Sequence, residues 1–139
     1  MAYNDQNVFA KILRGELPCI KVYEDEHTLA FMDIMPQVAG HTLVIPKVPA
    51  ETLFDLPADA ASHLIHSVQT VAAAVKAGMG VDGVVVMQLN GAAAGQTVPH
   101  IHFHLIPGSI LDLRNTHAQV MGDHAQIAAY AEKIRAAFV

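Results

Sequence analysis

The sequence predicts a single α+β domain over residues 1–139, with an antiparallel sheet of about five strands. One long central helix and short N- and C-terminal helices complete the predicted fold. Short apolar segments bounded by turn residues are typical of strands. The stretch after Pro57 has its apolar residues at helical spacing. With 139 residues, of which 53% are hydrophobic and 15% charged, the chain suits one globular domain with its own core.

The first half of the chain predicts one helix and three strands. Val8, Phe9 and Ile12 share a helical face after Asn7, and Gly15 stops this helix. Strands are expected over residues 20–24, 28–34 and 41–45. The links between the strands are short, so we expect an antiparallel meander.

The second half predicts the long helix, two strands and a last helix. Pro57 fits the first turn of the long helix, and Gly78 is expected to end it. Its apolar stripe comprises Leu64, Ile65, Val68, Val71, Ala72 and Val75. Strands are expected over residues 83–89 and 100–104. Asp123 and Gln126 can cap the last helix, whose buried stripe comprises Ile127, Ala131, Ile134 and Phe138.

Composition and charge exclude several classes of protein. The net charge of −5 and the absence of a Lys or Arg cluster argue against a nucleic-acid partner. Cys19 is the only cysteine, so no intrachain disulfide is possible. Residues 1–7 are polar and resemble no signal peptide, and no apolar run reaches the roughly 18 residues of a membrane span. We therefore expect a cytoplasmic protein with no membrane partner.

Residues 100–104 carry the most informative pattern of the chain, because His100, His102 and His104 alternate with apolar residues. Alternate side chains of a β-strand point to the same face. The three imidazoles would therefore line one face of a strand, while Ile101 and Phe103 pack on the other.

Three interpretations of this row compete. A solvated strand face is one, although such faces are usually built from Thr, Lys, Glu and Ser. A metal site is the second, but residues 89–107 contain no Asp, Glu or Cys that could complete it. The third is catalysis by the imidazoles, since histidine titrates nearest to neutral pH.

The loop before the histidine row favours the catalytic interpretation. Residues 90–99 are small, uncharged and rich in turn-forming residues, and such loops can aim backbone N–H groups at an anion. Gln96 and Thr97 add side-chain donors. The loop lacks the pattern of a P-loop. Next to three histidines, it indicates a phosphate site in which an imidazole is the nucleophile.

The run Gly95-Gln96-Thr97-Val98, followed by the three alternating histidines, resembles the signature of the histidine triad (HIT) family of nucleotide hydrolases and transferases. Residues 9–12, 22–26, 29–34 and 40–47 resemble the N-terminal half of the family. The resemblance implies a HIT-like fold whose sheet pairs across a two-fold axis to form a homodimer. We expect no metal or other cofactor in catalysis.

The resemblance also implies roles for single residues. His102 is the expected nucleophile, because a neutral imidazole attacks phosphorus without first losing a proton. His100 and His104 support it, and His41 matches a further histidine of the active site. The expected nucleotide-binding residues are Asp33 for the ribose, Asn90, Gly95, Gln96 and Thr97 for the phosphate, and Val8, Phe9, Ile12, Phe31 and Ile34 for the base.

Two of these assignments have plainer alternatives. Asp33 could be a turn residue at the end of a strand. The five apolar residues of the base slot could be ordinary core.

The chain departs from the family pattern at two places. Many bacterial members bind a structural zinc through a Cys-x-x-Cys and a later histidine, but Asn7, Ala10 and Pro49 stand at these positions here. We therefore expect no zinc. Gly108 follows Pro107 where related chains often have Arg, which disfavours long polyphosphate substrates.

The expected function is hydrolysis of nucleoside 5′-phosphoramidates at the α-phosphorus through a nucleotidyl-histidine intermediate. By resemblance, a purine nucleotide is the expected partner. Two alternatives stay open. One is a dinucleoside polyphosphate hydrolase, and the other is a nucleotide-binding module without significant turnover.

Overall fold

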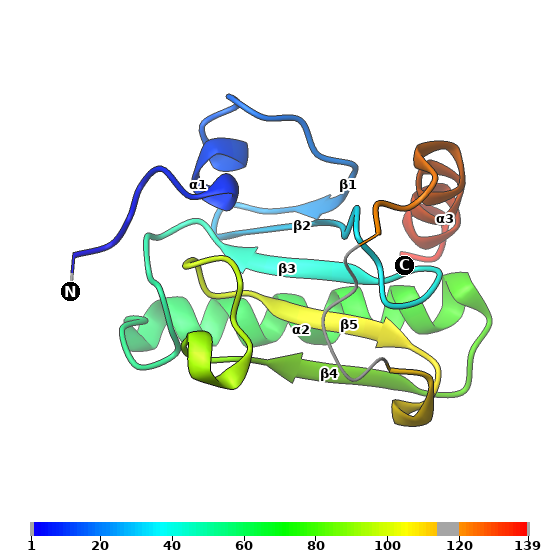
Figure 1. Ribbon diagram of the computed structural model, residues 1–139. Coiled ribbons are helices and arrows are strands. Elements are labelled where there is room, and N and C mark those ends of the chain that lie inside the picture. Colours follow the sequence, from blue (N-terminus) through cyan, green and yellow to red (C-terminus); the bar gives the residue numbers. More distant parts are fainter. Residues whose placement is uncertain (1, 114–119, 139) are drawn as a thin grey trace.

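The fold is an antiparallel five-stranded sheet with helices on both faces, seen here in a computed structural model that describes residues 2–113 and 120–138 (Figure 1). The strands are β1 (Lys21–Glu24), β2 (Thr28–Met32), β3 (Thr42–Pro46), β4 (Val84–Gln88) and β5 (Phe103–Pro107). The α-helices are α1 (Val8–Leu13), α2 (Ala58–Met79) and α3 (His124–Ala136). Short 3-10 helices cover Ala92–Ala94 and Ile110–Asp112. In the described part of the chain, no helix is long and apolar enough to cross a membrane.

The strands divide their side chains between two apolar layers. Val44 and Leu105 point to the layer that α2 and α3 cover, where they are buried with Val71 and Ile134. Phe31, Leu43 and Ile45 point to the opposite layer, where Phe9 of α1 packs on them. This alternation is the two-residue period of a strand. The histidines lie on the same face of the sheet as α1.

The sheet order β1-β2-β3-β5-β4 confirms an antiparallel sheet but corrects the meander. Only β1, β2 and β3 follow one another as neighbours. Strands β3 and β4 both pair antiparallel with β5, so they run in the same direction. Strands of equal direction need a crossover connection, which α2 provides. The crossover places β4 one strand position away from β3, and β5 lies between them.

The histidine row lies only partly in a strand, since β5 begins at Phe103. His100 and His102 belong to the segment that leads into the strand. The predicted division of faces nevertheless holds. Ile101 and Leu105 are fully buried in the layer of α2, and the histidines point to the other side.

The helices follow the predicted stripes with two corrections. Leu64, Val68 and Val71 are buried, but Ile65 is 49% exposed and lies outside the stripe. Helix α2 does not end at Gly78; it continues to Met79, and Gly80 caps it in the left-handed conformation with a φ of 65°. A Cβ atom on Gly78 would lie 2.7 Å from the backbone oxygen of Lys133, so this glycine allows α3 to approach α2 closely.

The short helices α1 and α3 begin and end close to the predicted residues. The side chain of Asn7 caps α1 by accepting a hydrogen bond from Ala10 N–H. Asp123 stands at the N-cap of α3, but its side chain makes no capping hydrogen bond. Ile127, Ala131 and Ile134 are buried as expected.

Candidate active site

His102 is held in one tautomer by the backbone of the segment before β5. Its Nδ1 atom lies 2.7 Å from the carbonyl oxygen of His100. A carbonyl oxygen only accepts, so the proton of the neutral ring is on Nδ1 and the lone pair is on Nε2. The ring is 5% exposed, and Phe9 packs edge-on against it with ring centroids 5.0 Å apart. This arrangement fixes both the direction and the protonation of the candidate nucleophile.

His100 is fully buried and uses both of its ring nitrogens in hydrogen bonds. Nε2 donates to the carbonyl oxygen of Pro46 at 2.9 Å, and Nδ1 lies 2.5 Å from the hydroxyl group of Tyr3. Burial lowers the pKa of His100 to about 4, although the hydrogen bond to Pro46 favours the protonated ring. His100 is therefore neutral at pH 7. It supports His102 through its backbone carbonyl group and is a positioning residue.

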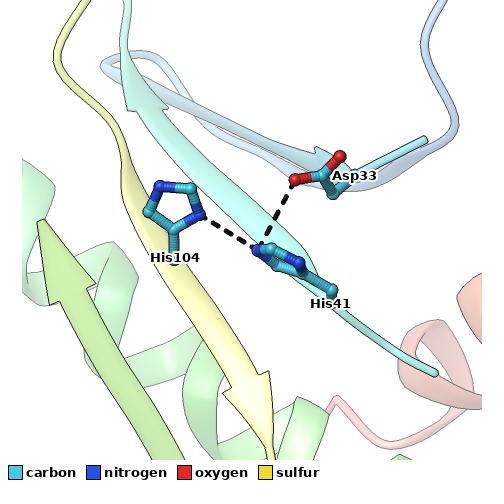
Figure 2. Close-up of side chains that lie close together, drawn as sticks. All are labelled: Asp33, His41 and His104. Carbon is cyan, nitrogen blue, oxygen red and sulfur yellow. Dashed lines mark hydrogen bonds and ion pairs between the residues drawn. The ribbon is translucent and has the colours of Figure 1, made fainter. Parts of the chain in front are cut away.

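Gln37, His41 and His104 form a second hydrogen-bonded chain on the same face, and Asp33 lies beside His41 at ion-pair distance (Figure 2). The backbone N–H of Gln37 donates to His41 Nδ1 at 3.0 Å, which leaves the proton of a neutral His41 on Nε2. His41 Nε2 lies 3.0 Å from His104 Nδ1 and 3.5 Å from a carboxylate oxygen of Asp33. His104 Nδ1 therefore accepts, and the proton of His104 is on Nε2.

The two chains meet where the rings of His102 and His104 lie side by side, with centroids 4.8 Å apart. One ring carries a lone pair on Nε2 and its neighbour carries an N–H group on Nε2. A nucleophile next to a hydrogen-bond donor suits attack on a phosphorus atom whose oxygens need charge stabilisation.

Asp33, His41 and His104 are also close enough to suggest a metal site, because one ligand atom from each lies within 4.8 Å of the others. A histidine that binds a metal through one nitrogen donates a proton from the other. In His41 that other nitrogen, Nδ1, receives the N–H of Gln37. A metal on Nε2 would force two N–H groups to face each other. The geometry therefore favours a hydrogen-bonded chain over metal binding at these residues.

The predicted phosphate-side residues stabilise their own loop. Gln96 is buried; its side-chain oxygen accepts from Gly91 N–H at 2.7 Å, and its amide group donates to the carbonyl oxygens of Glu51 and Val98. Asn90 accepts a hydrogen bond from Leu53 N–H at 2.7 Å. These two side chains hold the loop in place, whereas the side chain of Thr97 is exposed.

Glycine is required at the end of this loop. Gly95 has a φ of 108°, which L side chains rarely adopt, and it caps the 3-10 turn of Ala92–Ala94.

The predicted base slot separates into buried and exposed members. Phe9 and Phe31 are buried and touch each other edge-on, and Ile12 packs against the same cluster. Val8 and Ile34 are 47% and 48% exposed. Exposed apolar side chains can contact a ligand, whereas buried ones form part of the core. The ordinary-core alternative thus holds for Phe9 and Phe31, and the binding role of the exposed members stays a prediction.

Asp33 has the turn role that the sequence left open, and its ribose-binding role stays a prediction. One carboxylate oxygen accepts from Met35 N–H at 2.8 Å, as a turn residue would, and the other faces His41. The link to His41 adds a role that the sequence did not indicate.

Three contributors to the site carry no signal in the sequence. Gln37 and Pro46 act through backbone atoms, which any residue supplies. Tyr3 lies 97 positions before His100 in an N-terminal segment without a motif. Only the three-dimensional structure brings these residues to the histidines.

Comparison with known proteins finds a matching family model and similar curated proteins. The family model described as the HIT domain matches residues 14–111. An uncharacterized HIT-like protein of Methanocaldococcus jannaschii is 46% identical over 100 residues, which cover 72% of this chain and 77% of the relative. An adenosine 5′-monophosphoramidase of Schizosaccharomyces pombe is 40% identical over 100 residues, which cover 72% of each chain.

A solved structure shows the same fold. The Hit-like protein of Bartonella henselae, described as involved in cell-cycle regulation and crystallised with an unknown ligand, superposes with a TM-score of 0.91. It is 44% identical to this chain, and the match covers 99% of this chain and all of that one.

Proposed function

The chain belongs to the HIT domain family, and on that premise we propose that it hydrolyses nucleoside 5′-phosphoramidates through a nucleotidyl-His102 intermediate. The observation that carries the proposal is the hydrogen bond from His102 Nδ1 to the carbonyl oxygen of His100. It places the lone pair of the neutral ring on Nε2, so attack of this atom on the α-phosphorus needs no base to remove a proton. The relative named adenosine 5′-monophosphoramidase supports this substrate class.

The proposed reaction has two displacements at phosphorus. In the first, a bond forms from His102 Nε2 to phosphorus, the bond from phosphorus to the amine breaks, and the amine takes a proton from solvent. In the second, water attacks phosphorus and gives up a proton to solvent, the bond to His102 breaks, and the nucleoside monophosphate leaves. The carbonyl oxygen of His100 stabilises the positive charge that the His102 ring carries between these steps.

His104 is the proposed donor to a non-bridging phosphate oxygen. Its Nε2–H group would donate a hydrogen bond and keep its proton, because loss of the proton from a neutral ring would leave a costly imidazolate anion. His41 holds His104 in this tautomer from Nδ1. Thr97 adds a hydroxyl group for a phosphate oxygen or the leaving group, and Asp33 would accept hydrogen bonds from the ribose.

The test is AMP release from adenosine 5′-phosphoramidate and from a diadenosine polyphosphate, measured side by side with the His102→Ala variant as control. We expect faster release from the phosphoramidate, and its loss in the variant with AMP binding largely retained. Faster release from the polyphosphate would favour the dinucleoside polyphosphate branch. Tight AMP binding without release from either substrate would favour a binding module.

A further inference from the structure

We propose that Tyr3 is a positioning residue for His102, which it supports by donating a hydrogen bond from its hydroxyl group to His100 Nδ1. This inference rests on the proposed role of His102 as nucleophile. It assigns a part in the site to the N-terminal segment that precedes α1.

The donor and acceptor at this contact follow from the other nitrogen of His100. Nε2 donates its proton to the carbonyl oxygen of Pro46, so a neutral ring has only a lone pair on Nδ1. His100 is 0% exposed, so its ring is shielded from bulk solvent. A buried acceptor that loses its donor is costly. The hydroxyl group of Tyr3 therefore completes the hydrogen bonding of His100.

Asn7 sets the direction of the Tyr3 proton. Its amide nitrogen donates to the Tyr3 oxygen at 2.8 Å and to the carbonyl oxygen of Asn4 at 2.7 Å. Its amide oxygen accepts from Ala10 N–H, so the amide group cannot turn over without losing these partners. With a donor on one side, the Tyr3 hydroxyl must place its own proton toward His100. Burial raises the pKa of Tyr3, so the hydroxyl keeps that proton at neutral pH.

The same residues hold the peptide that fixes the nucleophile. Tyr3 also packs against the His100 ring, with centroids 5.7 Å apart. The backbone carbonyl of His100 accepts the Nδ1 proton of His102 at 2.7 Å. A shift of the His100 ring would move this carbonyl and change the direction of His102 Nε2. Displacements of about 1 Å at a reacting group can cost about 100-fold in rate.

The first test compares Tyr3→Phe with Tyr23→Phe. Both variants lose one hydroxyl group, and Tyr23 donates to Asp25 on the side of the sheet that α3 covers. We expect Tyr3→Phe to lower kcat about tenfold while KM and AMP binding change by less than about twofold. Tyr23→Phe should leave kcat unchanged. Equal kcat values for wild type and Tyr3→Phe would overturn the proposal, as would equal losses in both variants.

The second test reverses the hydrogen bond instead of removing it. In Asn7→Asp a carboxylate can still cap α1, but it accepts the Tyr3 proton and draws it away from His100. We expect a loss of kcat at least as large as in Tyr3→Phe, and no further loss in the double variant. Independent losses that multiply would contradict a shared role.

A measurement without turnover separates this proposal from the proposed function. Nitrogen-15 NMR of the His100 ring reports whether Nδ1 accepts a hydrogen bond. We expect the Nδ1 signal to move toward that of an unbonded nitrogen in Tyr3→Phe, and not in Tyr23→Phe. If the signal moves but wild type releases no AMP, the contact stands and the proposed function fails. An unchanged signal overturns the contact, whatever the activity.

Discussion

Two hydrogen-bonded chains fix the protons of the four buried histidines. His100 and His102 are held through carbonyl oxygens, and His41 is held through a backbone N–H. Each partner fixes one tautomer, and the tautomers determine which ring can attack and which can donate. The alternating spacing of residues 100–104 predicted the correct face for these rings. It could not predict the tautomers, because they depend on which backbone atoms the folded chain brings to each ring.

Substitution of Asp33 tests its predicted role in ribose binding. We expect Asp33→Ala to weaken binding of a ribonucleotide about tenfold or more and to leave that of the 2′,3′-dideoxy analogue nearly unchanged, because only the former has hydroxyl groups to donate. Calorimetric titration of the two ligands measures both. Equal losses would show that Asp33 acts through His41 alone, from which it lies 3.5 Å away.

At the scale of single elements, the turn between β1 and β2 is built around a polar network. One carboxylate oxygen of Asp25 accepts hydrogen bonds from the N–H groups of His27 and Thr28, and the other accepts from the hydroxyl group of Tyr23. Burial alone would raise the pKa of Asp25, but these hydrogen bonds lower it to about 2. Ser67 of α2 joins the network, so the turn is tied to the helix.

The lowered pKa of Asp25 predicts a pH dependence of stability. The carboxylate stabilises the folded state above its ordinary pKa of 3.8, and this contribution is lost as the pH falls from about 4 to 2. We expect the free energy of unfolding to fall by about 1–2 kcal/mol over this range in wild type, and less in Asp25→Ala. Urea unfolding at each pH measures it. Asp55→Ala, in the exposed turn after Thr52, is the control. Identical pH profiles for wild type and Asp25→Ala would contradict the role of this turn.

Gly78 shows why an element boundary can mislead. Glycine ends helices, and it also occurs where two backbones approach, and the sequence does not distinguish the two uses. Here a Cβ atom on Gly78 would lie only 2.7 Å from the backbone of α3 at Lys133. The sequence does predict both helices and their stripes, since these depend on periodicity within one segment.

Gly78→Ala should stabilise the protein if Gly78 is a free helical position, and destabilise it if Gly78 allows α3 to approach closely. Alanine is the better helix former by about 1 kcal/mol, so a free helical position would be stabilised. We expect destabilisation by about 1–3 kcal/mol, because the added methyl group must push α3 away. Ala77→Gly, at an exposed position of the same helix, measures the propensity difference alone. A rise in the unfolding temperature of Gly78→Ala would contradict the close packing.

The sheet as a whole ends at β4, which has a strand partner on one side only in the described part of the chain. Val86 of this edge strand is 46% exposed. Unpaired edges associate readily, and pairing of two such strands about a two-fold axis gives a closed dimer. The sequence predicted a five-stranded antiparallel sheet but not its order, because a crossover helix and a return strand leave the same local pattern as a meander. The homodimer and the cytoplasmic location stay predictions.

The dimer can be tested at Val86. We expect light scattering to give twice the 14.9 kDa of one chain, and Val86→Glu to shift the protein toward the mass of a single chain. Leu17→Glu, an exposed apolar position before the opposite edge strand, should not change the mass. A monomeric wild type, or a Val86→Glu protein that stays dimeric, would contradict assembly through β4.

Identification of the covalent intermediate tests the central claim most directly. Wild-type protein would be mixed with adenosine 5′-phosphoramidate, quenched in base within one turnover and digested for mass spectrometry, since a phosphoramidate linkage survives in base. We expect an adenylyl group on His102 and none in His102→Ala. An adduct on His104 or His41, or AMP release without any adduct under these conditions, would contradict His102 as the nucleophile.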